Sequence, residues 1–246
     1  MSDTLRTPRT GLVAGSVLLA GMVAAQVASG LHPRPVGLTS VVVLLLAASS
    51  LALAASACSL PRAAAAFGCA AVIGYAAELL GTTTGVPFGA YRYTGVLQPQ
   101  LAGVPVVVAL AWAGMGLAAY AVAPGGGWTR VVTGAVALTA WDLFLDPQML
   151  RLGLWVWEQE GPYRGVPLSN FAGWLAVSLL MMAAVHTVAG GIAGGTALVT
   201  LYTVMAVMET VGFAFVFEPP DPLIACFGGV GMGAFAVLAW RRRWRR

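Results

Sequence analysis

The sequence predicts an all-α integral membrane protein, a polytopic bundle of about eight transmembrane helices. Hydrophobic residues make up 59% of the 246 residues and charged residues only 9%, which is too few to give a soluble domain of this size a polar surface. Apolar runs of about 18 residues or more recur along the chain, and about 20 helical residues cross the hydrocarbon core of a bilayer. We expect a single membrane domain over residues 1–246.

Proline and glycine divide the apolar sequence into its spans. The interruptions read HPRPVG, LPR, APGGGW, AGGIAGG and EPPDP. The first apolar run is interpreted as an uncleaved helix, because equally apolar runs follow it. The fifth span carries Asp142 and Asp146, and Pro147 is expected to end that helix. The predicted spans are roughly 11–30, 38–60, 63–80, 103–123, 129–145, 168–189, 196–217 and 222–240, with Asp146 at the end of the fifth.

The distribution of arginine predicts the orientation of the bundle. An even number of spans places both termini on one side, and five of the thirteen basic residues, all arginine, form the C-terminal RRRWRR. Arginine is enriched on cytoplasmic segments, so we expect both termini in the cytoplasm and the protein in the cell membrane. The net charge of +4 comes from that tail, which favours membrane lipids rather than nucleic acid as partners. The absence of lysine excludes a retinal Schiff base.

Two segments of the sequence resemble each other. Glu78 is followed eleven residues later by GAYRY and then by GVP, and Asp142 is followed at the same distance by GLWVW and then by GVP. This pattern predicts a repeated helix–loop–helix unit over about residues 63–123 and 129–189, an arrangement that builds sites between repeats in membrane proteins. Chance similarity between two apolar segments is the alternative explanation.

Four acids fall within the predicted spans: Glu78, Asp142, Asp146 and Glu209. Ionisable residues inside a membrane are costly and mark candidate functional sites. Asp142 and Asp146 are four residues apart, so both carboxyl groups lie on one face of a helix. Burial favours the protonated form of a carboxyl group, which is the form that a general acid needs. Arginines outside the spans offer the alternative of simple ion pairs with these acids, namely Arg92, Arg151 and Arg164.

The two aromatic loops are the second candidate feature. Tyrosine and tryptophan are common at membrane interfaces, but their ring faces also stabilise cations. In an extended strand, Tyr91 and Tyr93 point to one side and Arg92 to the other. Asn170, close after GVP, offers an uncharged hydrogen bond, and the alternative is that it is only a polar residue at a helix N-terminus. No Cys or His spacing indicates a metal site. The residues expected to contact a substrate are Tyr91, Arg92, Tyr93, Trp155, Trp157 and Asn170.

These motifs together resemble a known family. The stretches AAELLGTTTGVPFGAYRYTG, AWDLFLDPQM and GPYRGVPLSNFAGW, with the later MET and FEP, are similar to the CruF-type carotenoid biosynthesis proteins. These are membrane-bound carotenoid 1,2-hydratases, and bisanhydrobacterioruberin hydratases are one branch. The resemblance runs from about Gly74 to Pro222. It implies hydration of a terminal isoprenoid double bond of an acyclic or monocyclic carotenoid, without a cofactor. The substrate would come from the bilayer, and other enzymes of the pathway are candidate partners.

Such a hydration needs a proton donor and a group that handles the attacking water. Two carboxyl groups in different environments can divide these tasks. We assign proton donation to Asp142 or Asp146, and we expect Glu78 to orient water or to hold the partner charge. Glu209 is expected to relay protons or to fix the other acids. Tyr91, Tyr93 and Trp157 would flank the tertiary cation.

Two other functions stay open from the sequence. An intramembrane prenyltransferase could hold Mg²⁺ and a diphosphate on the two aspartates of DLFLD, although it would need more basic residues than the loops offer. A carotenoid-binding or lipid-binding protein, or a proton-coupled carrier, could also use acids within its spans. Dependence on Mg²⁺ and formation of a hydroxylated product distinguish these functions from the hydratase.

Overall fold

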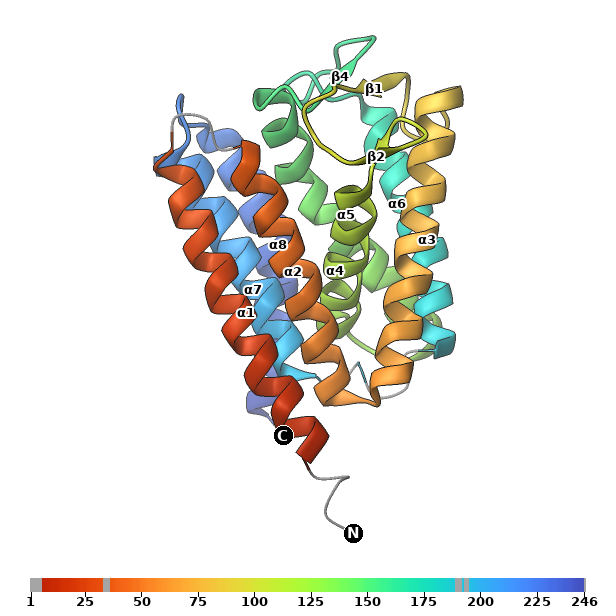
Figure 1. The fold of residues 1–246 in the computed structure, drawn as a ribbon, viewed down its shortest axis with the longest axis vertical. Helices are drawn as coiled ribbons and strands as arrows, with labels where there is room; N and C mark the ends of the chain where they lie inside the picture. The colour runs from red at the N-terminus through yellow and green to blue at the C-terminus, as the bar shows by residue number, and fades with distance from the viewer. Residues whose placement is uncertain (1–5, 33–35, 189–191, 193–194, 246) are drawn as a thin grey trace.

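The computed structural model describes residues 6–32, 36–188, 192 and 195–245. The predicted breaks HPRPVG and AGGIAGG lie partly outside these residues. Within them, eight α-helices match the eight predicted spans in order, and the predicted all-α bundle is confirmed (Figure 1). The elements are α1 (Arg6–Gly30), α2 (Val36–Ala57), α3 (Leu60–Thr84), β1 (Tyr91–Tyr93), β2 (Gln100–Leu101), β3 (Val104–Pro105), α4 (Val106–Val122), α5 (Gly127–Arg151), β4 (Trp155–Trp157), α6 (Leu168–Val188), α7 (Thr196–Val211), the π-helix η2 (Gly212–Val216) and α8 (Pro222–Trp244).

Six of the helices are long and apolar enough to cross a bilayer: α1, α2, α3, α6, α7 together with η2, and α8. Large apolar side chains on their outer faces are exposed, among them Val13, Val72, Leu180 and Val230. An apolar outer surface of this extent suits contact with lipid rather than water. The chain therefore has the character of a polytopic membrane protein.

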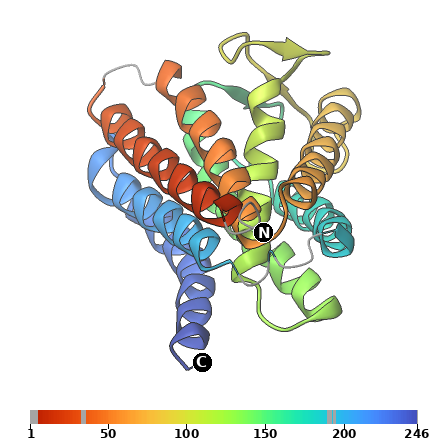
Figure 2. The same ribbon diagram turned by 60° about the horizontal axis from the view of Figure 1, so that its bottom comes forward.

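Of the two remaining helices, α4 lies in the interior of the bundle, whereas α5 is buried on one side and exposed on the other. α4 has only 17 residues, and nearly all of them are buried. A helix that is apolar all round must be covered by other elements, and α4 packs against α2, α3, α5 and α7 (Figure 2). α5 is longer, with 25 residues, but it includes Arg130, Asp142, Asp146 and Arg151. Its inner acids therefore face the protein interior rather than lipid.

α1 begins and α8 ends at one end of the bundle, and the strands lie at the other (Figure 1). The loop after α3 contains β1, and the loop after α5 contains β4, so these two loops meet at the same end. The segment after η2 joins them there through Asp221, which pairs with Arg151 and Arg164. The polar loops after α3, α5 and η2 are thus gathered at one face of the bundle, while the side of the cell that this face meets stays a prediction.

The third helix is longer than the sequence indicated. α3 continues through three threonines to Thr84 instead of ending near residue 80. Each threonine hydroxyl donates to a carbonyl one turn earlier; Thr83 Oγ1, for example, donates to the Leu79 oxygen at 2.7 Å. Gly85 then ends the helix with φ of +74°, a conformation that glycine adopts easily. Glu78 therefore lies more than a turn inside α3 and not in its final turn.

The expectation that Pro147 ends the fifth helix is wrong, because α5 continues to Arg151. Proline has no N–H to donate to the carbonyl four residues earlier, which belongs to Leu143. The hydroxyl of Tyr163, from the loop after β4, donates to that carbonyl at 3.0 Å. A side chain far along the chain thus replaces the missing helix hydrogen bond.

Candidate active site

A pair of short antiparallel strands forms the outer wall of the candidate site. β1 pairs with β4 so that Tyr91 faces Trp157 and Tyr93 faces Trp155. These four aromatic side chains turn toward the protein interior, while the residue between them on β1, Arg92, is exposed. The predicted alternation in the Tyr-Arg-Tyr segment is therefore present. Arg92 does not line the cavity described below, so its expected contact with a substrate finds no support in its position.

Both tyrosines of β1 donate hydrogen bonds to Glu78. The Tyr93 hydroxyl lies 2.7 Å from Glu78 Oε2, and the Tyr91 hydroxyl donates to the same oxygen. The other oxygen, Oε1, accepts the indole N–H of Trp112 at 2.8 Å. Glu78 is only 5% exposed. Three donors on one buried carboxyl group can stabilise its ionised form.

The two tyrosines stay protonated donors over the whole physiological range. Burial, with the neighbouring Glu78 carboxyl group, raises the pKa of Tyr91 and of Tyr93 above the ordinary tyrosine value. Tyr91 also packs on Trp157, with ring centroids 5.0 Å apart. The strand pair thus holds two fixed hydroxyl donors over the end of α3.

A glycine on α6 brings that helix against the loop that carries β1. A Cβ at Gly173 would lie 2.6 Å from the carbonyl oxygen of Pro87, a distance that real Cβ atoms essentially never reach. One turn earlier, the Ser169 hydroxyl donates to the Phe88 carbonyl oxygen at 3.0 Å. These two contacts fix the position of α6, and with it Asn170, relative to Glu78 and β1.

The two aspartates of α5 share one hydrogen-bond donor. Asn170 Nδ2 lies 2.7 Å from Asp142 Oδ2 and also donates to Asp146 Oδ2. All three side chains are buried, with Asp142 fully inaccessible. Asp142 Oδ1 has no hydrogen-bond partner among the described residues. The predicted common face of the two carboxyl groups is therefore present, and Asn170 is the residue that joins them to α6.

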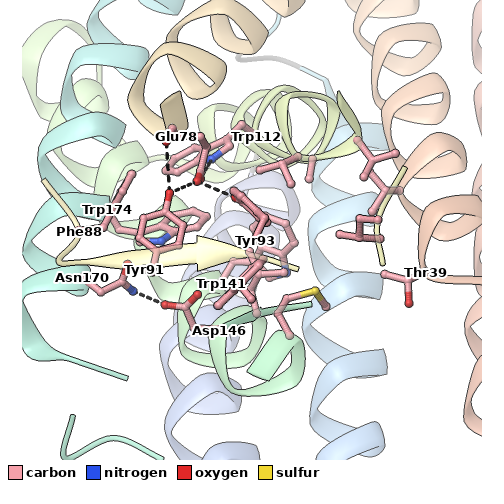
Figure 3. A pocket seen from close by; sticks show the side chains of 18 of the residues that line it. Thr39, Glu78, Phe88, Tyr91, Tyr93, Trp112, Trp141, Asp146, Asn170 and Trp174 are labelled. Atoms are coloured by element: carbon pink, nitrogen blue, oxygen red, sulfur yellow. Dashed lines mark hydrogen bonds between the residues drawn. The ribbon is translucent and has the colours of Figure 1, made fainter. Parts of the chain in front are cut away.

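These groups surround a cavity of about 60 Å³, shown in Figure 3. Glu78 lies on one wall and Asp146 on another, and Asn170 lies beside Asp146. Asp142, one turn before Asp146 on α5, is fully buried and does not line the cavity. Half of the remaining lining residues are aromatic, namely Phe88, Tyr91, Tyr93, Trp112, Trp141, Trp155, Trp157 and Trp174.

Tryptophans on three different helices were not predicted as site residues. Trp112 of α4 stacks on Trp174 of α6, with ring centroids 3.8 Å apart and 18° between the planes. Trp141 of α5 meets Trp174 edge to face, at 6.1 Å and 84°. In the sequence they read as ordinary apolar helix residues. Their spacing held a signal, because Trp141 directly precedes Asp142 and Trp174 lies four residues after Asn170.

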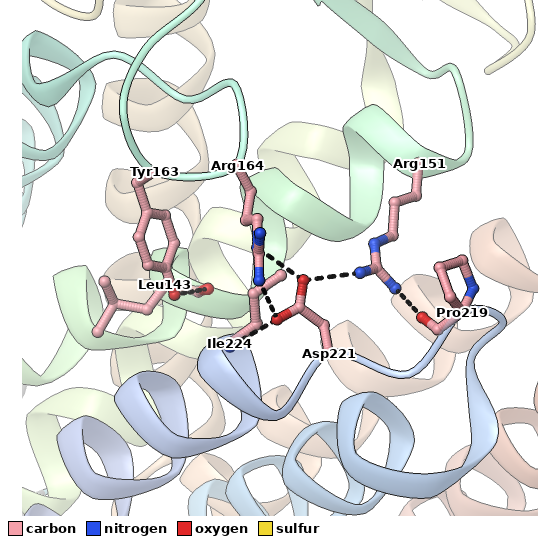
Figure 4. A network of polar contacts seen from close by, with 7 residues as sticks. All are labelled: Leu143, Arg151, Tyr163, Arg164, Pro219, Asp221 and Ile224. Carbon is pink, nitrogen blue, oxygen red and sulfur yellow. Dashed lines mark hydrogen bonds and ion pairs between the residues drawn. The ribbon is translucent and has the colours of Figure 1, made fainter.

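Two arginines near this end of the bundle, Arg151 and Arg164, bind a different acid. Arg164 contacts Asp221 through two nitrogens, Nε at 2.8 Å and Nη2 at 3.0 Å, and Arg151 Nη2 lies 2.9 Å from the same carboxyl group (Figure 4). Asp221 also caps α8 by accepting the Ile224 N–H. Burial alone would raise the pKa of Asp221, but its hydrogen bonds and ion pairs, those of Arg164 above all, hold that pKa below the ordinary value. No basic side chain lines the cavity in the described part of the chain.

Glu209 lies apart from the other three acids. It lines a second, larger cavity between α1, α2, α5 and α7, and not the aromatic cavity. Within the described ranges, no group of three or more His, Cys, Asp or Glu side chains is placed to hold a metal ion. The structure therefore brings together Glu78, Asp142, Asp146, Asn170 and the aromatic residues of both loops, and it separates Glu209 and Arg92 from them.

The chain matches known proteins over the part that carries this site. A family of carotenoid biosynthesis proteins matches residues 39–225, more than half of the chain. A bisanhydrobacterioruberin hydratase from Haloarcula japonica is 32% identical over 122 residues, which are 46% of this chain and 41% of that protein. The alignment thus spans less than half of the relative. No solved structure matches the chain. The extent of the family match shows that this chain belongs to the carotenoid biosynthesis protein family.

Proposed function

We propose that this protein is a carotenoid hydratase that adds water to a terminal isoprenoid double bond. The observation that carries the proposal is that two buried carboxyl groups, those of Glu78 and Asp146, line a cavity walled by aromatic rings, with the buried Asp142 joined to Asp146 through Asn170. The name of the Haloarcula japonica relative supports the same reaction class. An alkene brings no charged or polar handle to a site, which fits a wall that is mainly apolar.

Asp146 is the proton donor in this proposal. Asp142 and Asp146 are buried side by side and share the Asn170 amide, and two adjacent carboxyl groups without a cation do not both ionise readily. The pair therefore carries a proton. Asp146 lines the cavity and Asp142 does not, so Asp146 is the member that can reach the substrate, and Asp142 holds the proton behind it.

Glu78 is the ionised partner. Its three hydrogen-bond donors stabilise a carboxylate. A negative charge on this wall of the cavity would stabilise a cation formed there, and the faces of Trp112 and Trp174 would add to that effect. The same carboxylate can accept a proton from water that enters the cavity.

The reaction balances without an external reagent. The π electrons of the double bond take the proton of Asp146 at the less substituted carbon, which leaves a tertiary cation at the other carbon. A water oxygen bonds to that cation, and one proton of this water passes to Glu78. Transfer of that proton back to the aspartate pair restores the site. The net change is alkene plus water to tertiary alcohol.

The lining of the cavity argues against chemistry on a diphosphate. Prenyl transfer needs cationic partners for the phosphate groups, and no Arg or His lines this cavity among the described residues. Both aspartates are also engaged by Asn170. A carrier would need the same acids but would return its ligand unchanged, so analysis of the product separates it from a hydratase.

The test is conversion of an ene-ended acyclic carotenoid by purified protein in detergent, with water enriched in ¹⁸O. We expect a more polar pigment that carries one ¹⁸O atom per hydrated end, and the same yield in EDTA. Asp146→Asn should lower the rate about 10²–10⁴-fold, the usual contribution of a general acid. Glu158→Gln is the matched control, because Glu158 is exposed in the loop after β4 and should retain full activity.

Three outcomes would contradict the proposal. Recovery of unchanged carotenoid with folded protein would favour a binding or transport protein. A strict requirement for Mg²⁺ and a diphosphate would favour a transferase. Full activity of Asp146→Asn would remove Asp146 from the role of proton donor.

A further inference from the structure

A second cavity lies beside the aromatic one and is several times larger. Its volume is about 320 Å³, and its walls come from the end of α1, the first half of α2, the last part of α5, and α7 with η2. Apolar side chains make up most of the wall, among them Val42, Leu46, Met205 and Phe217. This composition suits a hydrocarbon ligand.

The two cavities meet between α2 and α5. Five residues line both of them, two from α2 and three from α5: Thr39, Val43, Trp141, Leu145 and Met149. In Figure 3, Thr39 lies on the opposite side of the aromatic cavity from Asn170 and Trp174. The second cavity therefore adjoins the first on the side away from Asn170.

The volumes of the two cavities suit a single chain-like ligand, with its end in the smaller cavity and a longer part in the larger one. A water-sized group needs roughly 10–15 Å³ of such volume, so the 60 Å³ cavity holds only the few atoms of a chain end. The 320 Å³ cavity holds a much longer section. A chain whose end reaches Asp146 would leave the aromatic cavity between Val43 and Leu145 and enter the larger one.

Two buried polar oxygens in the second cavity lack partners. Among the described residues, neither Glu209 Oε2 nor Gln26 Oε1 has a hydrogen-bond partner. Glu209 is only 7% exposed, and the amide nitrogen of Gln26 contacts the sulfur of Met205 at 3.5 Å. Buried polar atoms are nearly always satisfied, so these two oxygens indicate a ligand that supplies a hydrogen-bond donor.

An alcohol fits these requirements better than a charged group. A cationic ligand would have to be desolvated in a mainly apolar cavity, and an anionic one would meet the Glu209 carboxyl group. A hydroxyl group donates to one oxygen and can accept from a protonated carboxyl group. A hydrocarbon chain with one hydroxyl group would pack against the apolar wall and donate a hydrogen bond to the oxygen of Glu209 or Gln26.

We propose that the second cavity binds an isoprenoid chain that carries a hydroxyl group, with the hydroxyl at Glu209 and Gln26. The hydrocarbon lies along α2 and α5 toward the aromatic cavity. Glu209 is then a specificity residue for the ligand rather than a member of the acid set. The isoprenoid nature of the chain rests on the proposed function, while the hydroxyl preference rests on the cavity itself.

The test is ligand binding to the purified protein in detergent, measured by the quenching of tryptophan fluorescence and by the shift in melting temperature. The probes are geranylgeraniol, the hydrocarbon in which hydrogen replaces its hydroxyl, and the straight-chain alcohol hexadecanol. We expect geranylgeraniol to bind about tenfold more tightly than the hydrocarbon, the effect of one buried hydrogen bond. Hexadecanol should bind more weakly than geranylgeraniol.

Two variants test whether Glu209 and Gln26 cause the preference for the alcohol over the hydrocarbon. Glu209→Leu should reduce the preference for the alcohol to about twofold or less, and Gln26→Leu, on a different helix, should reduce it as well. Met208→Leu is the matched control, because Met208 lines the same cavity without a charge, and it should keep the full preference.

Some outcomes would overturn the proposal. Equal binding of alcohol and hydrocarbon to the unaltered protein would remove the hydroxyl site, and so would an unchanged preference in folded Glu209→Leu. Hexadecanol bound as tightly as geranylgeraniol would remove the selection for an isoprenoid. Binding is measured without turnover, so it separates this proposal from the hydratase: selective binding of the alcohol by a protein that hydrates no carotenoid would contradict the hydratase and leave the hydroxyl site standing.

Discussion

Removal of the Tyr163 hydroxyl should expose the weak point that Pro147 creates in α5. In the unaltered protein this hydroxyl donates to the Leu143 carbonyl at 3.0 Å. Tyr163→Phe deletes the donor but keeps the ring, which packs edge to face on Phe171 and Phe227 with centroid distances of 5.5 and 6.3 Å. The variant therefore isolates one hydrogen bond.

The expected loss in the free energy of unfolding depends on which donors remain for the Leu143 carbonyl. A buried carbonyl left without a donor costs about 1–3 kcal/mol, and bilayer hydrocarbon provides no water as a substitute. Tyr163 and Leu143 are only half-buried, so we expect the lower part of this range, about 1–2 kcal/mol. Burial and the charge of Asp221 raise the pKa of Tyr163 to about 12, so the hydroxyl stays a donor at any pH used in the assay.

The assay is a double-mutant cycle on the free energy of unfolding in detergent. Pro147→Ala restores a backbone N–H that can reach the Leu143 carbonyl within the helix. In that background, Tyr163→Phe should cost less than about 0.5 kcal/mol, since the carbonyl already has a donor. An equal loss in both backgrounds would refute the idea that Tyr163 replaces the bond that Pro147 removes.

Two further predictions concern packing and charge. Gly173→Ala should lower thermal stability and carotenoid conversion, because the new Cβ would lie 2.6 Å from the Pro87 carbonyl oxygen. Gly233→Ala is the control: a Cβ there would meet no atom within 4 Å, so this variant should be neutral or slightly stabilising. Equal effects of the two substitutions would contradict the close contact of α6 with the loop. The lowered pKa of Asp221 means that its ion pairs stabilise the folded state above the unfolded value of about 3.9, and that this contribution is lost as the pH falls through the folded value. The stability difference between the unaltered protein and Asp221→Asn should therefore shrink as the pH falls from about 5 to 3, and a constant difference would argue against these ion pairs.

Much of the fold could be predicted because it depends on local properties. The lengths of the apolar runs predicted eight helices, and the spacing of Asp142 and Asp146 predicted their common face. The alternation of Tyr91, Arg92 and Tyr93 predicted two rings on one side of a strand. Each of these depends on residues within one segment, and all are confirmed.

What depends on distant segments could not be predicted. The prediction that Pro147 ends the fifth helix was wrong because Tyr163, from the loop after β4, replaces the missing hydrogen-bond donor. The stack of Trp112 on Trp174 depends on how α4 and α6 pack. Glu209 resembled the other membrane acids in sequence, and only the arrangement of α7 places it in a different cavity.

The pairing of β1 with β4 gives this protein an unusual sensitivity to small insertions. Side chains alternate along a strand, so a shift of β1 by one residue would exchange its two faces. Arg92 would then turn inward, and both tyrosines would turn out toward the membrane surface. Glu78 would exchange two neutral hydroxyl donors for a permanent cation. In the mechanism that we propose, that cation would repel the carbocation formed in the cavity. A single inserted residue in this loop would thus invert the electrostatics of the cavity while leaving every helix in place.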